Sequence, residues 1–224
     1  MCWQALQHTQ GADKPPTLPA RSVMKDLFTG HHVGQSRPLR LSDDVVSTAT
    51  YGGEDNCYRY TLRRVWEEGR PMVMWLMMNP SVATEHGDDR TVAKCQRYAR
   101  AWGYGGLFVG NTFAYRCTDQ TRLLETPDPV GPGNDAALLD MARKADLVVA
   151  AYGSPHHKGL RARGPQVVQM LQNHGIAVCA LRLSAGGRPC HPLYLPADLK
   201  PFELPATSPA AQMAWQAGRG KGRS

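Results

Sequence analysis

Four short apolar segments, separated by amphipathic stretches, constrain the fold more than any other feature of this 224-residue sequence. The clearest is 72–78, which reads MVMWLMM and is typical of a strand covered on both faces. Further strands are predicted at 107–110, 147–151 and 176–181. Because helical patterns lie between these strands, the alternation indicates a three-layer α/β/α fold with a central parallel four-stranded sheet.

The helices are predicted from apolar spacing and from residues that begin or end a helix. The segment 90–102 carries apolar residues at helical spacing and is followed by Gly103 and Gly105. Asn134 is expected to cap a second helix that runs to residue 144. A third helix is expected to begin at Pro165 and to end at Gly175.

Two segments rich in Val, Thr and Tyr, 45–51 and 57–66, precede the sheet and predict a β-hairpin. Residues 1–44 are expected to form a flexible leader with one short helix around 23–28. Residues 205–224 are expected to form a mobile basic tail. The sequence therefore predicts a single α/β domain over 45–204.

Charge and cysteine content narrow the functional classes. Twenty-six basic residues against 19 acidic ones give a net charge of +7, which is compatible with a polyanionic partner. No apolar run approaches the ~18 residues of a membrane helix, and the N-terminus lacks the pattern of a secretory signal. The six cysteines contain no C-x-x-C pair, which predicts reduced thiols in a cytoplasmic protein. A metal site at Cys190 and His191 is the less favoured alternative.

A short polar motif follows each predicted strand of the sheet. The motifs are MMNPS after the first strand, GNTF after the second, YGSPHHKG after the third and, further on, HPLYLP after the fourth. Ligands of open parallel α/β sheets bind beyond the carboxyl ends of the strands. The four motifs are therefore expected to converge on one cleft.

These motifs resemble those of the uracil-DNA glycosylase superfamily, whose members carry GQDPYH or GINPG, then LLLN, LWG and HPSPLS. This chain reads MMNPS, LFVGNTF, AAYGSPHHKG and HPLYLP in the same order over residues 72–196. The chain also resembles a bacterial domain family of unknown function with NPS and HPLYLP motifs and a preceding hairpin. The superfamily resemblance implies an enzyme that flips a base out of duplex DNA and breaks its N-glycosidic bond.

The resemblance implies two catalytic residues. Asn79 falls in the first motif, where its carbonyl oxygen can accept a hydrogen bond from a water molecule and orient it. His191 opens the fourth motif, where a ring N–H can stabilise the negative charge of the departing base. The alternative for both is an ordinary loop residue that satisfies backbone groups.

Five further residues are expected to contact the substrate. Asn111 offers one donor and one acceptor to a pyrimidine edge, and Phe113 either stacks on the base or fills the core. Pro80 and Ser81 complete the first motif. The superfamily's best-known members carry a tyrosine at the position of Ser81, so a small residue leaves room for a 5-substituent on the pyrimidine. Asp89, like Asp88, either supplies a carboxylate near the sugar or caps the following helix.

The remaining candidates are expected to contact DNA. Basic side chains beside the third and fourth motifs can hold phosphates, and apolar side chains of the fourth can enter the minor groove. The basic candidates are Lys158, Arg161, Arg163 and Arg188, and the inserted candidates are Leu193 and Tyr194. The alternative for the basic residues is an ordinary solvated surface.

Together these expectations describe a monomeric DNA glycosylase that binds double-stranded DNA and needs no metal or other cofactor. It would excise a pyrimidine, with a 5-modified base of phage DNA as the favoured substrate, in phage defence or base-excision repair. No lysine lies in the first or fourth motif, so a lyase step has no evident nucleophile. The alternatives are a hydrolase or transferase of free nucleosides or nucleotides, and a non-catalytic DNA-binding module.

Overall fold

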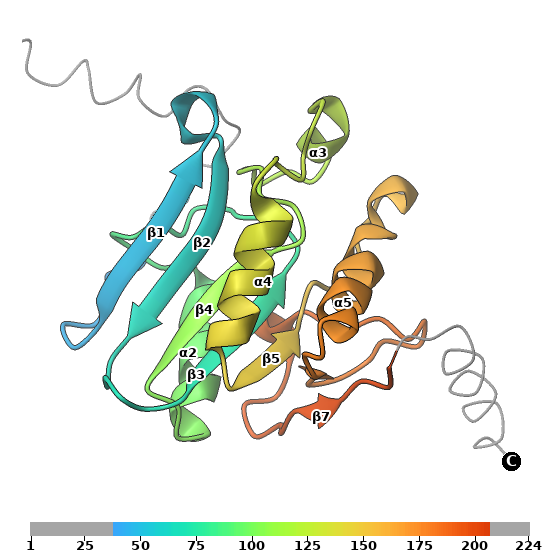
Figure 1. The fold of residues 1–224 in the computed structure, drawn as a ribbon. Coiled ribbons are helices and arrows are strands. Elements are labelled where there is room, and N and C mark those ends of the chain that lie inside the picture. The colour runs from blue at the N-terminus through green and yellow to red at the C-terminus, as the bar shows by residue number, and fades with distance from the viewer. Residues whose placement is uncertain (1–37, 207–224) are drawn as a thin grey trace, which may run out of the picture.

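The computed structural model describes residues 38–206, and Figure 1 shows their arrangement. Seven strands form one sheet in the order β1-β2-β4-β3-β5-β6-β7. Its four central strands pair in parallel. They are β3 (Met72–Met77), β4 (Gly106–Asn111), β5 (Leu147–Ala150) and β6 (Val178–Ala180). The predicted parallel core is therefore confirmed, with bounds that differ by no more than two residues.

Antiparallel strands extend the sheet at both edges. The hairpin of β1 (Val46–Gly52) and β2 (Tyr58–Val65) joins it because β2 pairs with β4. At the other edge β7 (Phe202–Glu203) pairs with β6. The hairpin thus extends the main sheet as well as preceding it in sequence, and β7 is a strand that the sequence did not predict.

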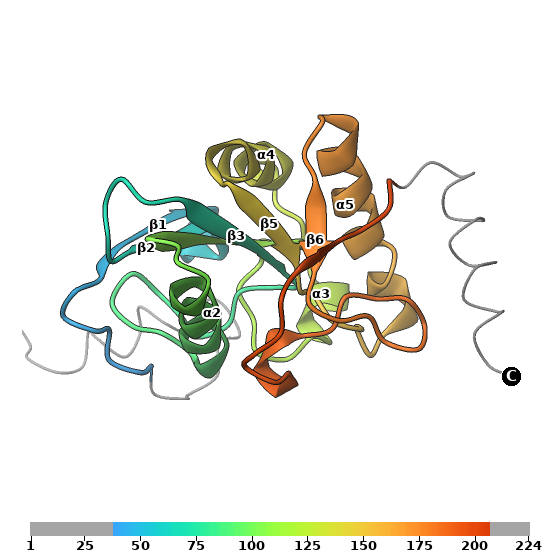
Figure 2. The ribbon, with the colours of Figure 1, turned by 90° about the horizontal axis from the view of Figure 1, so that it is seen from below.

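Helices cover both faces of the sheet, as Figure 2 shows. Helix α2 (Arg90–Ala101) packs on one face, where the rings of Trp75 and Tyr98 lie 5.7 Å apart. Helices α4 (Asn134–Lys144) and α5 (Arg163–Asn173) pack on the other. The three-layer α/β/α architecture is therefore confirmed.

Short helices lie in the connections. They are η1 (Glu54–Asn56) in the hairpin turn, α3 (Arg122–Glu125), η2 (Lys158–Leu160) and η3 (Pro192–Tyr194).

Helix α5 begins two residues before Pro165, and the chain turns away at Gly175, where φ is +75°. Asn134 does not cap α4, because Gly133 holds that position. Its side chain is fully buried and instead donates hydrogen bonds to the carbonyl oxygens of Asn111 and Thr112.

The end of the expected leader contacts the domain, since Leu39 and Asp88 exchange backbone hydrogen bonds of 2.7 and 3.0 Å. The helix predicted around 23–28 and almost all of the predicted tail lie outside the described residues. Within 38–206, no helix is long and apolar enough to cross a membrane.

Candidate functional site

A cavity of about 400 Å³ lies at the carboxyl ends of the central strands. Asn79 follows β3, Asn111 ends β4, Gly153 follows β5, and His191 precedes η3; all four line the cavity. Strands β4 and β5 lie on opposite sides of β3, so the chain changes direction at this point of the sheet. Ligands of doubly wound folds bind at such a switch point. The structure therefore brings the four predicted motifs to one cavity.

The side chain of Asn79 is held in one orientation. Its Nδ2 donates hydrogen bonds to the carbonyl oxygens of Cys117 at 2.6 Å and of Pro80 at 3.2 Å. Within the described part of the chain, Oδ1 makes no hydrogen bond. The amide thus keeps its acceptor available to a ligand or to water, as the expected role requires.

His191 presents a ring donor. Its Nδ1 accepts a hydrogen bond from the backbone N–H of Leu193 at 3.4 Å, so the neutral ring carries its hydrogen on Nε2. Burial lowers the pKa of His191, although the charge of Asp89 opposes this shift. Gly153 has φ of +71°, and a Cβ atom there would lie 3.4 Å from the Cβ of His191. The lowered pKa favours the neutral form of the His191 ring. The positive φ and the close approach to His191 favour glycine at position 153.

Arg59 is a cavity residue that the sequence analysis missed. It lies on β2, is 3 % exposed, and donates from Nη1 to the carbonyl oxygen of Ala83 at 2.6 Å and from Nη2 to Oδ1 of Asn111 at 3.0 Å. Its Nε has no hydrogen-bond partner, and no carboxylate among residues 38–206 lies within salt-bridge distance. Burial lowers the pKa of Arg59 to about 10, so the side chain remains charged near pH 7. A buried cation with no ion-pair partner is costly, which points to a functional role.

Asn111 is more constrained than the sequence implied. It is 2 % exposed, and its Oδ1 accepts the hydrogen bond from Arg59. Its backbone carbonyl oxygen accepts from Asn134 at 2.9 Å. Among the described residues, Nδ2 has no partner. The expected donor–acceptor pair is therefore reduced in this structure to a donor.

The other substrate-contact candidates divide between cavity and core. Ser81 lines the cavity and lies 3.2 Å from the hydroxyl of Thr118. Pro80 is buried outside the lining, and its carbonyl oxygen accepts from the backbone N–H of Cys117 at 3.1 Å. Phe113 packs in a buried cluster with Cys117, Leu123 and Leu160. Phe113 thus fills the core, which is one of its two expected roles, and does not line the cavity.

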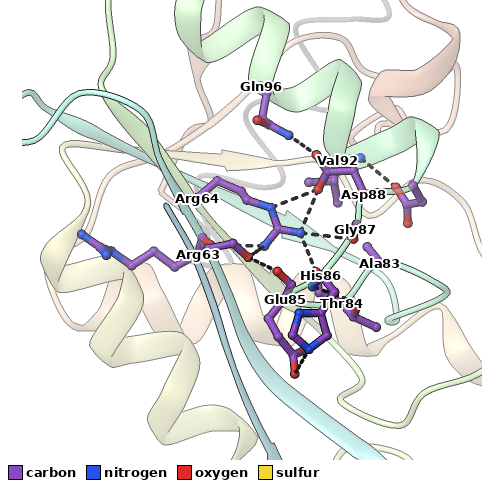
Figure 3. Close-up of polar contacts among 12 residues, drawn as sticks. Arg63, Arg64, Ala83, Thr84, Glu85, His86, Gly87, Asp88, Val92 and Gln96 are labelled. Atoms are coloured by element: carbon purple, nitrogen blue, oxygen red, sulfur yellow. Dashed lines mark hydrogen bonds and ion pairs between the residues drawn. The ribbon is translucent and has the colours of Figure 1, made fainter. Parts of the chain in front are cut away.

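The two acidic candidates have different roles. Asp89 lines the cavity and also caps α2, because its carboxylate accepts from the N–H of Val92 at 2.8 Å. Asp88 is 4 % exposed, and Arg64 donates to its Oδ1 from Nη2 at 2.8 Å and from Nε at 3.0 Å. Gln96 donates to the other oxygen of Asp88, as Figure 3 shows. Asp88 thus acts in a buried network and does not line the cavity.

This buried network holds the wall of the cavity. The fully buried Arg64 also donates to the carbonyl oxygens of Thr84 at 2.6 Å and Gly87 at 3.3 Å (Figure 3). These residues belong to the connection from β3 to α2, which also supplies the Ala83 carbonyl to Arg59. Two arginines of β2 therefore anchor the same segment.

None of the four predicted basic contacts lines the cavity. Arg161 donates to the carbonyl oxygens of Pro155 and His156, and Arg163 donates to that of Thr112 and pairs with Asp135. Arg161 thus holds its own loop and Arg163 holds the segments of Thr112 and Asp135, so both are less available to phosphates. Lys158 is exposed, while Arg188 is half-buried.

The two predicted inserted residues also differ. Tyr194 lines the cavity and is 83 % exposed, with its ring 6.2 Å from that of His191. Leu193 is half-buried and is not part of the lining. Of the two, Tyr194 is therefore the one that lies at the cavity and can reach outward.

Residues 38–206 contain no group of three or more His, Cys, Asp or Glu side chains placed to hold a metal ion. The cysteines in this region, Cys190 included, are free thiols.

A family model matches residues 59–193, which extend from Arg59 through the first three strand-end motifs to Leu193 in the fourth. The model is described as "Protein of unknown function (DUF1643)". Comparisons with curated proteins and with solved structures give no match. Because the model covers more than half of the sequence, the chain belongs to the DUF1643 family of proteins of unknown function.

Proposed function

We propose that this protein is a DNA glycosylase that removes a flipped-out pyrimidine by hydrolysis. The observation that carries the proposal is the placement of Asn79 and His191 on one cavity, with an acceptor oxygen from the first and a ring donor from the second. Hydrolysis of an N-glycosidic bond needs both groups, because water must be oriented at the sugar and negative charge must be stabilised on the base.

The proposed reaction uses these two residues as follows. The bond between C1′ of the sugar and N1 of the base breaks, and its electron pair stays on the base. Asn79 Oδ1 orients a water molecule, whose oxygen forms the new bond to C1′ and whose proton passes to the solvent. The Nε2–H of His191 donates to O2 of the departing base. The positive charge of Arg59 further favours an anion in the cavity.

The cavity has room for a base larger than uracil. Its volume of about 400 Å³ lies in the range of small-molecule sites, and the side chain at the expected steric gate is the small Ser81. We therefore retain a 5-substituted pyrimidine as the favoured substrate, such as a hydroxymethylated or glucosylated base of phage DNA. Such a substrate fits a role in phage defence, and an unmodified or damaged base would fit repair.

A second candidate is a hydrolase or transferase acting on a free nucleoside or nucleotide. It is favoured by the internal hydrogen bonds of Arg161 and Arg163, because these arginines are less available to the phosphates of a duplex. The same cavity chemistry would then act on a small molecule. A DNA-binding module without catalysis is the remaining alternative.

We also propose that the protein works as a monomer in the cytoplasm and that its macromolecular partner is double-stranded DNA. The free thiols of the described cysteines support a reducing compartment. The net charge of +7 supports a polyanionic partner.

The test is to incubate the protein with phage genomic DNA that carries either normal or hypermodified pyrimidines. Abasic sites and released bases are then measured by mass spectrometry, beside a parallel reaction on free nucleosides. We expect base release from modified DNA by the natural protein and none by Asn79→Ala or His191→Ala. Full activity in both variants would contradict the assignment. Turnover of nucleosides alone would favour the second candidate, and DNA binding without turnover the third.

A further inference from the structure

Arg59 is a buried cation whose charge is not neutralised by any residue of 38–206. The two hydrogen bonds that it donates go to neutral oxygens, the carbonyl of Ala83 and Oδ1 of Asn111. Further along the same strand, the buried Arg64 instead pairs with the carboxylate of Asp88 at 2.8 Å. The described chain thus supplies an anion to one arginine of β2 and not to the other. Because an unpaired buried charge is costly, we expect Arg59 to serve a ligand.

The contact between Arg59 and Asn111 makes this part of the cavity wall a surface of hydrogen-bond donors. A guanidinium group carries donors and no acceptor. Oδ1 of Asn111 already accepts from Nη2 of Arg59 at 3.0 Å, which leaves the Nδ2 donor of the amide. Within residues 38–206, neither this Nδ2 nor Nε of Arg59 has a hydrogen-bond partner. A ligand group that only accepts hydrogen bonds and carries negative charge matches such a wall.

The cavity lining also contains one carboxylate, that of Asp89. Burial lowers the pKa of Arg59, and the charge of Asp89 opposes this shift. Asp89 forms no ion pair with Arg59 in the described structure, and it accepts a hydrogen bond from the N–H of Val92 at 2.8 Å. Its like charge should weaken the binding of an anion in the cavity.

We propose that Arg59 and Asn111 form a subsite for an oxyanion, which a nucleotide supplies as its phosphate group. Arginine is well suited to phosphate, because its planar guanidinium can donate two parallel hydrogen bonds to two oxygens. The cavity of about 400 Å³ lies in the size range of small-molecule sites. The choice of a nucleotide rests on the proposed function, whereas the oxyanion subsite rests on the wall itself. A free nucleotide and a nucleotide in DNA both supply the phosphate, and separate arms of the experiment distinguish them.

The first arm measures binding of deoxycytidine and deoxycytidine 5′-monophosphate to the full-length protein by isothermal titration calorimetry. Inorganic phosphate is the third probe. We expect the monophosphate to bind at least about tenfold more tightly than the nucleoside, because a hydrogen bond between charged groups is stronger than a neutral one.

The second arm measures binding of a short DNA duplex without terminal phosphates by fluorescence anisotropy. A loss of duplex affinity of about tenfold in Arg59→Met would assign the subsite to a phosphate of DNA. An advantage of the monophosphate with unchanged duplex affinity would assign it to a free nucleotide. Absence of both effects would overturn the proposal.

Variants of the two subsite residues test whether the missing partner is an anion. Arg59→Met removes the charge and should abolish the advantage of the phosphate, whereas Arg59→Lys should keep part of it. Asn111→Asp places a carboxylate where the amide oxygen lies 3.0 Å from Nη2 of Arg59. It should therefore abolish phosphate binding and raise the melting temperature, because it supplies the absent ion pair. Retained phosphate binding in Asn111→Asp would overturn the proposal even where Arg59→Met fails to fold.

Two further variants control for charge and for burial. Asp89→Asn keeps an oxygen that can cap α2 and removes the like charge, so phosphate should bind severalfold more tightly. Weaker binding in this variant would contradict the subsite. Arg116→Met is the matched control, since Arg116 is also buried, also has an unpartnered Nε, and does not line the cavity. Equal losses of phosphate binding in Arg116→Met and Arg59→Met would show a general effect on the fold and overturn the proposal.

Base release from duplex DNA by the natural protein tells failure of this proposal from failure of the proposed function. Release without any effect of Arg59 on phosphate binding would refute the subsite and leave the glycosylase function standing. A phosphate effect without release would refute the glycosylase function and leave the subsite standing.

Discussion

The side-chain nitrogen of Asn79 donates a hydrogen bond to the carbonyl oxygen of Cys117 over 2.6 Å, and so joins the end of β3 to the segment that follows β4. The contact turns the amide oxygen of Asn79 to the opposite side, where it can accept from water. An exposed loop asparagine would need no such anchor. This bond therefore supports the water-orienting role that we propose for Asn79.

Replacing Asn79 should impair the orientation of the attacking water without weakening the binding of duplex DNA. Asn79→Ala removes the acceptor, and we expect base release to slow by about 10²–10³-fold while duplex binding changes by less than about tenfold. The lost hydrogen bond to Cys117 should also lower the free energy of unfolding by about 1 kcal/mol. Single-turnover release and fluorescence anisotropy measure the two effects. Loss of binding in parallel with activity would show that Asn79 has a general structural role.

His191 predicts how stability depends on pH. Burial holds its pKa below the ordinary value of 6.5, so below that pH the unfolded chain binds a proton more readily than the folded chain. Stability should therefore fall as the pH decreases from about 6.5 through the lowered pKa of His191. Urea unfolding between pH 7.5 and 5 measures this slope.

In His191→Gln the decrease should be smaller, because the group whose protonation opposes folding is absent. His174→Gln is the control, since His174 is exposed and does not line the cavity. Identical slopes for the natural protein and His191→Gln would contradict the buried neutral imidazole.

The ion pair of Arg64 and Asp88 should dominate local stability. Arg64→Ala leaves a buried carboxylate without its cation, and we expect a loss of about 3–5 kcal/mol in the free energy of unfolding. Arg70→Ala removes an exposed pair with Glu67 and should cost no more than about 1 kcal/mol. Denaturant unfolding compares the two. Similar small losses in both variants would show that Arg64 does not hold the connection from β3 to α2.

Ser81 predicts the tolerance for substituents at position 5 of the base. Ser81→Tyr places a ring on the cavity wall, so release of a 5-substituted pyrimidine should fall by at least about tenfold. Release of the unsubstituted base should change far less. Ser81→Ala controls for loss of the contact with Thr118. Equal losses on both substrates in Ser81→Tyr would argue against a steric gate.

Of the basic residues after β5, Lys158 should contribute to DNA binding and Arg163 to the stability of the fold. Lys158 is exposed, so Lys158→Ala should reduce the salt slope of duplex binding by about one without loss of stability. Arg163→Ala should chiefly lower stability, because Arg163 holds the Thr112 carbonyl and Asp135. Binding titrations from low to high salt, with a thermal melt of each variant, make the comparison. An unchanged slope in Lys158→Ala would remove this residue from the DNA interface.

The sequence by itself determined the layered α/β fold and the sheet edge that holds the cavity. Strand β3 was predicted because its continuous apolar run can be satisfied only by burial on both faces, as the fully buried Trp75 shows. The polar motifs after the strands could also be located from the sequence, because each one directly follows a predicted strand or lies a short way beyond it. Parallel strands in a doubly wound sheet place their carboxyl ends together, so local sequence signals identified residues that are distant along the chain.

Only the tertiary structure decided which polar groups remain available at that edge. No local pattern indicates that Arg59 of the hairpin reaches Asn111, because the contact depends on β2 pairing with β4 across 52 residues of sequence. The environments of Phe113 and Arg163 also depend on tertiary packing. Phe113 is buried by residues of distant segments, and Arg163 forms an ion pair with Asp135. Hydrophobic periodicity is a local property and can be read from neighbouring residues of the sequence. Hydrogen-bond partners of buried side chains depend on how distant elements pack, which only the folded molecule shows.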